Sequence, residues 1–135
     1  MTCDEALQKF GLPASPESRD RIRQLLADEI ELEKRGEGGE EMLRVLCLQL
    51  FSLGSIEDAL LIWEAKQSSF DACCGLDIQF LCGAGLEVTK EYLARSGDPA
   101  APAALEHLIG SEESRDFEGW IPQKSIERYR SYYGI

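Results

Sequence analysis

The sequence has few of the residues that metal sites and nucleophilic active sites require. It contains a single histidine, His107, in 135 residues. Its five cysteines are an odd number, and none has the CxxC or CxxH spacing that is typical of zinc sites. We therefore expect no metal site and no disulfide framework. Unpaired thiols favour a reducing compartment, which we expect to be the cytoplasm.

Long hydrophobic runs and an excess of basic residues are absent too. Apolar stretches such as residues 59–63 are far shorter than the ~20 residues that cross a bilayer, and acidic rather than basic residues follow Met1. With 14 Lys+Arg against 25 Asp+Glu, the net charge is -11, which repels nucleic-acid phosphates and anionic lipid headgroups. We therefore expect no membrane partner, no nucleic-acid partner and no secretion signal.

What the chain does contain is the composition and periodicity of a helical domain. It is 44% hydrophobic and 29% charged, which is typical of a globular protein, and its length suits one domain over residues 1–135. Apolar residues recur at helical spacing, and no segment alternates as a strand does. The sequence predicts an all-α fold of six to eight helices, arranged as stacked antiparallel hairpins in a solenoid-like array or an irregular bundle.

Capping residues and glycines predict where helices begin and end. Thr2 starts a capping box, and the glycine-rich residues 36–39 separate a long amphipathic helix from the next one. Residues 70–75 are expected to form a tight corner. A later helix is expected to end before Gly110, followed by an acidic surface loop over residues 111–119.

Two short apolar helical segments lie on either side of Gly54. If Gly54 is the inter-helix glycine, the packing positions of the two segments are Leu43, Leu46, Cys47, Leu50, Ala59 and Trp63. On these residues, the segment 40–70 resembles one degenerate tetratricopeptide unit, which implies a helix-turn-helix hairpin. The pattern departs from that family at Lys66, where a small residue is expected.

The candidate partner-binding residues lie in this hairpin and directly after it: Trp63, Lys66, Asp71, Asp77 and Gln79. Asp77 and Gln79 interrupt an apolar run. Polar groups in such a run are either paired inside the core or exposed in a groove. The sequence leaves both alternatives open, a core network that joins two hairpins or a groove for a ligand or peptide.

No nucleophile, base and orienting group can be assembled from these residues, so the sequence predicts a non-catalytic protein-interaction domain of adaptor or regulatory type. The glycines at 83 and 85 lack the lysine and the preceding strand of a phosphate loop, and we expect no cofactor. One alternative is a thiol-dependent enzyme. Against it, Asp71 and Asp77 flank the cysteine pair at 73–74, and negative charge raises the pKa of a thiol.

The second alternative is an acidic immunity- or inhibitor-type protein that neutralises a basic toxin or nuclease. Residues 57–118 carry thirteen Asp/Glu and four Lys/Arg, a difference of -9. Binding through such a surface would weaken steeply with salt, whereas binding through apolar contacts in a groove would not.

The C-terminal segment combines aromatic residues with two arginines: Trp120, Arg128, Tyr129, Arg130, Tyr132 and Tyr133. Such residues are enriched at protein interfaces, but a terminal helix that docks on an acidic body needs the same types. We expect docking within the chain, with the tyrosines packing and the arginines meeting carboxylates.

Overall fold

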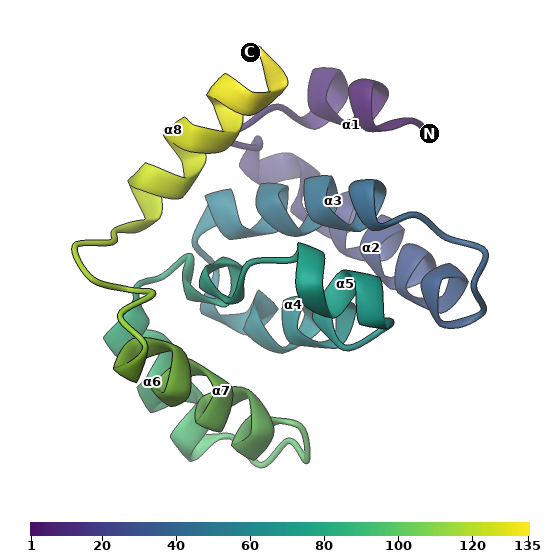
Figure 1. The fold of residues 1–135 in the computed structure, drawn as a ribbon. Coiled ribbons are helices and arrows are strands. Elements are labelled where there is room, and N and C mark those ends of the chain that lie inside the picture. Colours follow the sequence, from purple (N-terminus) through teal and green to yellow (C-terminus); the bar gives the residue numbers. More distant parts are fainter.

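In the computed structural model, which describes residues 1–135, the chain is entirely helical and has no strand (Figure 1). The α-helices are α1 (Cys3–Phe10), α2 (Arg19–Lys34), α3 (Glu40–Leu53), α4 (Ala59–Lys66), α5 (Phe70–Gly75), α6 (Leu86–Arg95), α7 (Ala101–Glu113) and α8 (Pro122–Tyr133). Three short 3₁₀ helices join them: η1 (Pro16–Ser18), η2 (Ile56–Asp58) and η3 (Ile78–Cys82). The predicted all-α fold is confirmed, with eight α-helices.

Helix α3 lies at the centre of the fold. Every residue from Val45 to Phe51 is buried. A helix that is apolar on all sides has to be covered on all sides. Helix α2 packs antiparallel along α3 after the turn at residues 36–39, while α1, α5, η3 and α8 cover its other faces (Figure 1). One continuous cluster of 31 buried residues results.

A buried glutamine in α3 holds α1 in place. The Nε2 atom of Gln49 donates to the carbonyl oxygens of Ala6 and Gly11, both at 3.0 Å. These carbonyls belong to α1 and to its C-cap residue Gly11, which lies past the last helical turn and has no helical partner for its oxygen. At the other end of α1, Thr2 and Glu5 form the predicted capping box.

The second half of the chain forms a smaller layer beside α3. The end of η3 approaches α3 so closely that a Cβ on Gly83 would collide with the carbonyl oxygen of Phe51. Helices α6 and α7 then pack against each other as a hairpin, on the side of the molecule away from α1 and α8 (Figure 1). Gly54 ends α3 with a left-handed φ of 71°, as expected for an inter-helix glycine.

The structure corrects two of the expected boundaries. Residues 70–75 form helix α5 rather than a corner, because the Ser69 hydroxyl accepts from the backbone N–H of Ala72 at 3.0 Å and caps a new helix. Helix α7 continues through Gly110 to Glu113, so the acidic loop starts later than expected. The cost of a glycine inside a helix, about 1 kcal/mol, is offset by packing of the α7 residues on either side of it.

The segment that resembles a tetratricopeptide unit spans α3, η2 and α4. Within it, α3 packs more extensively on α2 than on α4. The buried carboxylate of Asp58 at the start of α4 accepts from Nε of Arg23 at 2.6 Å, which ties α4 to α2 as well. The tetratricopeptide resemblance of residues 40–70 stays a prediction.

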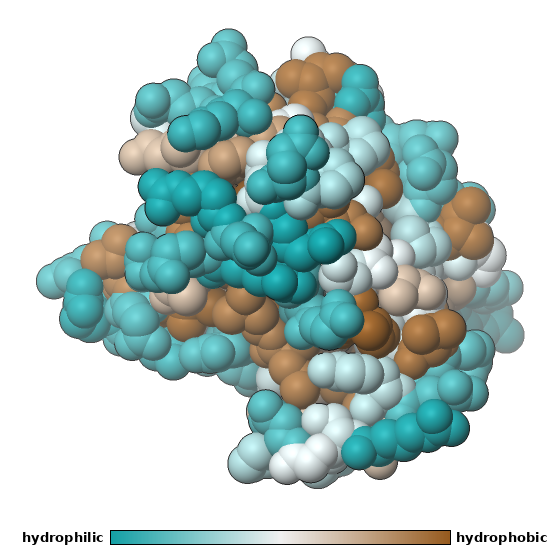
Figure 2. Space-filling view, turned by 180° about the vertical axis from the view of Figure 1, so that it is seen from behind, coloured by the Kyte–Doolittle hydropathy of each residue, from teal (hydrophilic) through white to brown (hydrophobic).

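The outer surface is mostly polar. Figure 2 shows a broad hydrophilic area over the middle of the molecule from behind, where the outward face of α2 lies. None of the helices combines the length and the apolar composition needed to cross a membrane.

The C-terminal helix α8 docks on the body of the protein, as expected from its residues. The ring of Tyr129 lies 5.5 Å from that of Phe80, and its hydroxyl donates to Asp77 at 2.8 Å. Arg128 donates to the same carboxylate at 2.6 Å, and Arg130 donates to a backbone carbonyl near α1. Tyr132 departs from the expectation, since 66% of it is exposed.

We predict that deleting residues 121–135 lowers the melting temperature by roughly 10 °C, because it removes the buried side chain of Ile126 and the half-buried rings of Tyr129 and Tyr133, which together contribute about 3 kcal/mol. Thermal unfolding followed by circular dichroism measures the shift. The matched control is Tyr132→Ala, which removes an exposed ring of the same helix and should change the melting temperature little. An unchanged melting temperature in the deletion variant would show that α8 adds no stability.

Candidate functional site

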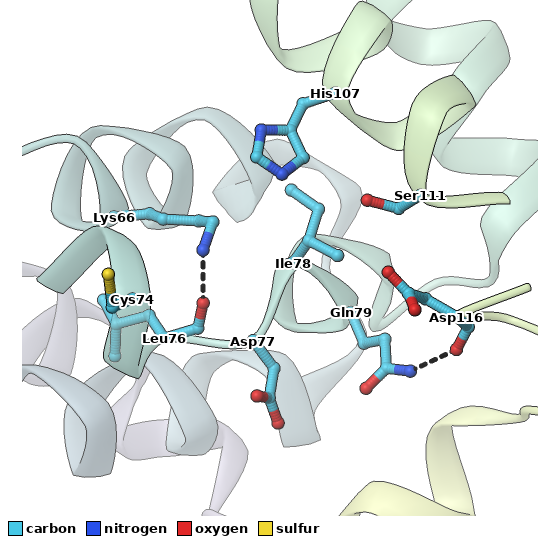
Figure 3. Close-up of a pocket in the computed structure, with 9 residues that line it drawn as sticks. All are labelled: Lys66, Cys74, Leu76, Asp77, Ile78, Gln79, His107, Ser111 and Asp116. Atoms are coloured by element: carbon cyan, nitrogen blue, oxygen red, sulfur yellow. Dashed lines mark hydrogen bonds between the residues drawn. The ribbon is translucent and has the colours of Figure 1, made fainter. Parts of the chain in front are cut away.

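A cavity of about 350 Å³ lies between the end of α4, the η3 segment and α7 (Figure 3). Its lining is mostly polar and comes from three separate stretches of sequence: Lys66, then Cys74, Leu76, Asp77, Ile78 and Gln79, and finally His107, Ser111 and Asp116. Polar side chains from distant parts of the chain therefore converge on one space.

Lys66 forms one wall of the cavity and is 95% buried, with a relative exposure of 5%. Its Nζ donates to the carbonyl oxygens of Cys73 at 2.5 Å and Leu76 at 2.6 Å. Both oxygens lie at the C-terminal end of α5, where backbone carbonyls lack helical partners and attract a cation. Lys66 forms no ion pair with a carboxylate within the chain, and these two carbonyl oxygens are its hydrogen-bond partners.

Helix α7 provides the opposite wall. His107 and Ser111 are four residues apart on this helix, so they lie on the same face. The imidazole packs edge-on against the ring of Trp63, with centroids 5.5 Å apart. Ser111 is buried, with 8% exposed, and its hydroxyl and the ring nitrogens of His107 form no hydrogen bond within the chain. These donor and acceptor groups face the cavity without an internal partner.

The two polar residues that interrupt the apolar run have mainly structural partners. Asp77 accepts from Arg128 and Tyr129 of α8. The side-chain amide of Gln79 donates to the backbone carbonyl of Asp116 at 2.7 Å and anchors the turn after α7. These contacts form a network within the chain, which is one of the two alternatives that the sequence left open. Both side chains also line the cavity.

Charges of opposite sign lie on opposite sides of the cavity. In Figure 3, Lys66 is on one side and Asp116 on the other, with Ile78 between them. The Asp116 carboxylate has no ion-pair or hydrogen-bond partner within the chain, whereas the charge of Asp77 is compensated by Arg128. A ligand that fills the space meets a positive end and a negative end.

The structure brings three of the five candidate binding residues, Lys66, Asp77 and Gln79, to this cavity. Trp63 packs against His107, which lines this cavity. Trp63 itself lines a separate cavity of about 390 Å³, together with residues of α4 and the α6–α7 turn. Asp71 is exposed on α5 and lies at neither cavity.

Sequence reasoning missed His107, Ser111 and Asp116. The i, i+4 spacing of His107 and Ser111 is a usable signal. The shared helix face of these two residues was not recognised because the helix was expected to end before Gly110. Nothing in the sequence indicates that α7 lies opposite Lys66.

The cysteines are divided between the core and the surface. Burial raises the pKa of the Cys82 thiol to about 12 and raises that of Cys47 as well, so both are protonated at neutral pH. Cys74 is exposed at the cavity rim. The chain brings together no group of three or more His, Cys, Asp and Glu side chains that could hold a metal ion.

Comparison with known proteins finds no matching family model, no similar curated protein and no similar solved structure.

We predict that the pKa of His107 lies below its ordinary value of 6.5, because burial disfavours the imidazolium and the charge of Lys66 repels it, while Asp116 acts in the opposite direction. The folded state then binds this proton less readily than the unfolded state. The contribution of His107 to stability is present above pH 6.5 and is lost as the pH falls through the lowered pKa. As His107 is the single histidine, an NMR titration of its ring protons measures the pKa directly.

Two variants check the causes of this shift. Asp116→Asn should lower the pKa of His107 further, whereas Glu106→Gln, which changes a neighbouring residue that does not line the cavity, should leave it unchanged. A titration midpoint at or above 6.5 contradicts the described surroundings of the imidazole.

Proposed function

We propose that the chain is a non-catalytic protein-interaction domain, of adaptor or regulatory type, which binds its partner at the cavity between α4, η3 and α7. The observation that carries the proposal is the set of polar groups in this cavity without an internal partner. Buried polar groups in folded proteins are nearly always paired. The ammonium of Lys66, a residue more than nine-tenths buried, has two carbonyl oxygens but no carboxylate as partners, and the hydroxyl of the buried residue Ser111 makes no hydrogen bond within the chain, so we infer that a bound group supplies the missing contacts.

The chemistry of the cavity supports binding rather than catalysis. His107 has no nucleophile in hydrogen-bond contact and no carboxylate that orients its ring. Lys66 is held by two carbonyl oxygens in a fixed position, which suits a recognition contact. The site can therefore hold a ligand but offers no complete set of reacting groups.

The proposal predicts that a charge placed in the cavity abolishes partner binding. His107→Glu adds a negative charge at the lining, and Ser114→Glu adds the same charge at an exposed residue just past the end of α7. In affinity capture at near-physiological salt, the partner should be retained by the wild-type protein and by Ser114→Glu and lost from His107→Glu. Circular dichroism verifies that both variants fold.

Two results would overturn the proposal. One is that no protein is retained by the wild type at micromolar bait concentration. The other is that His107→Glu and Ser114→Glu retain the same proteins, which would place the interface elsewhere.

A second candidate, the acidic inhibitor-type protein, is favoured by the exposed carboxylates at the end of α7 and in the turn after it. Glu112, Glu113, Asp116 and Glu118 are all exposed there. Lys90 pairs with Glu112 at 2.8 Å, and the other three remain available to a basic surface. The nearest exposed base, Arg115, lies 3.8 Å from Glu118 in a weak surface pair.

The two candidates differ in their salt dependence. A basic partner bound on this acidic surface should dissociate at least tenfold more readily when salt rises from ~50 mM to ~500 mM, and Glu113→Gln with Glu118→Gln should weaken it. A partner held in the cavity should depend on His107 and change less with salt. Calorimetric titration of the captured partner at both salt concentrations separates the two.

A further inference from the structure

The arrangement of donors in the cavity indicates which chemical group a partner places there. We propose that the cavity binds the C-terminal carboxylate of a partner polypeptide, with Lys66 and Ser111 as the groups that hold the carboxylate. The inference rests on the proposed function and specifies the part of the partner that enters the cavity.

The ammonium group of Lys66 has no carboxylate as a counter-ion within the chain. An ammonium group has three N–H donors, and two of them bond to the carbonyls of Cys73 and Leu76. Those two bonds fix the direction of the group and leave one donor. A buried charge is costly unless an opposite charge compensates it, so an anion in the cavity would be stabilised.

Helix α7 presents neutral donors to the same cavity. The hydroxyl of Ser111 is buried at the cavity without a partner in the chain, and it can donate one hydrogen bond. His107, one helical turn away on the same face, offers a ring N–H. Lys66 and helix α7 therefore present donors to one cavity from different walls, and a carboxylate, whose two oxygens accept without donating, matches donors that have no acceptor of their own.

The charge on the far side of the cavity favours a carboxylate over a phosphate as the ligand. Asp116 lines the far side of the cavity with an uncompensated negative charge, which would repel a dianion that fills the space. A terminal carboxylate has a single charge and is followed at once by a backbone N–H. The carboxylate of Asp116 and the Oε1 atom of Gln79 are acceptors on the side where such an N–H would lie (Figure 3).

The surface around the cavity limits which residues the rest of the partner can carry. The surrounding surface is acidic, since residues 57–118 carry thirteen Asp/Glu and four Lys/Arg. It would repel a segment that carries several carboxylates, but it accepts one terminal carboxylate on a neutral or basic chain. A cavity of about 350 Å³ suits the last one or two residues of such a chain.

The test uses a pool of N-acetylated tetrapeptides with randomised residues and a free C-terminal carboxylate. Matched probes are the same pool with amidated C-termini, and inorganic phosphate. The probes are added to the full-length protein, and the ring signals of His107 and the amide signal of Ser111 are followed by NMR. The acid pool should shift both signals and raise the pKa of His107, because a bound anion favours the imidazolium. The amide pool should shift neither.

Variants then assign the donors. Ser111→Ala should weaken binding of the acid pool about tenfold, through loss of one hydrogen bond to a charged group, whereas Ser114→Ala should bind as the wild type does. Lys66→Met should abolish binding. As Lys66 also holds two carbonyls, Ser111→Ala remains the decisive variant if Lys66→Met does not fold.

Several outcomes overturn the inference. Equal shifts with the acid and amide pools show that the carboxylate is not recognised, and a stronger response to phosphate shows a general anion site. If no peptide binds while a captured partner still depends on His107, the carboxylate inference fails and the proposed function stands. If both experiments fail, so does the proposed function.

Discussion

Burial of α3 on every side is the constraint on which the other elements depend. A helix with seven consecutive buried residues has no face that can contact water, and no single neighbour can cover it. The chain therefore surrounds α3 with elements from both halves of the sequence. This arrangement brings η3, which follows α5, against the C-terminal half of α3, and the absence of a side chain at Gly83 permits the close contact. The first residues of η3, Ile78 and Gln79, line the cavity.

The cavity is a consequence of how the second layer is built. Helix α5 is short and ends at Gly75, so its last carbonyls face the end of α4. Lys66 at the end of α4 is long enough to reach them, and its ammonium donates to the carbonyl oxygens of Cys73 and Leu76.

Local signals in the sequence were sufficient for much of the fold. Thr2 and Gly54 each act within three or four residues, and the helices that they begin or end are found as expected. The continuation of α7 beyond Gly110 was not predictable in this way. It depends on burial of Ser111 against other elements, and such tertiary packing outweighs the low helix propensity of one glycine.

The candidate site illustrates the same limit for function. Lys66, Asp77 and Gln79 stood out in the sequence because polar residues within an apolar run need partners, but the sequence does not reveal the partners. The structure gives the three residues different partners. Asp77 accepts from Arg128 and Tyr129 of α8, and the side-chain amide of Gln79 donates to the turn after α7. Lys66 donates to backbone carbonyls and has no carboxylate as a counter-ion. The core-network alternative thus describes the bonded side-chain atoms of Asp77 and Gln79, and the groove alternative describes the cavity that Lys66 lines. The network fixes the cavity walls through contacts that the C-terminal helix makes, and because those contacts occupy Asp77, they leave Lys66 and Asp116 as the charged groups available to a ligand.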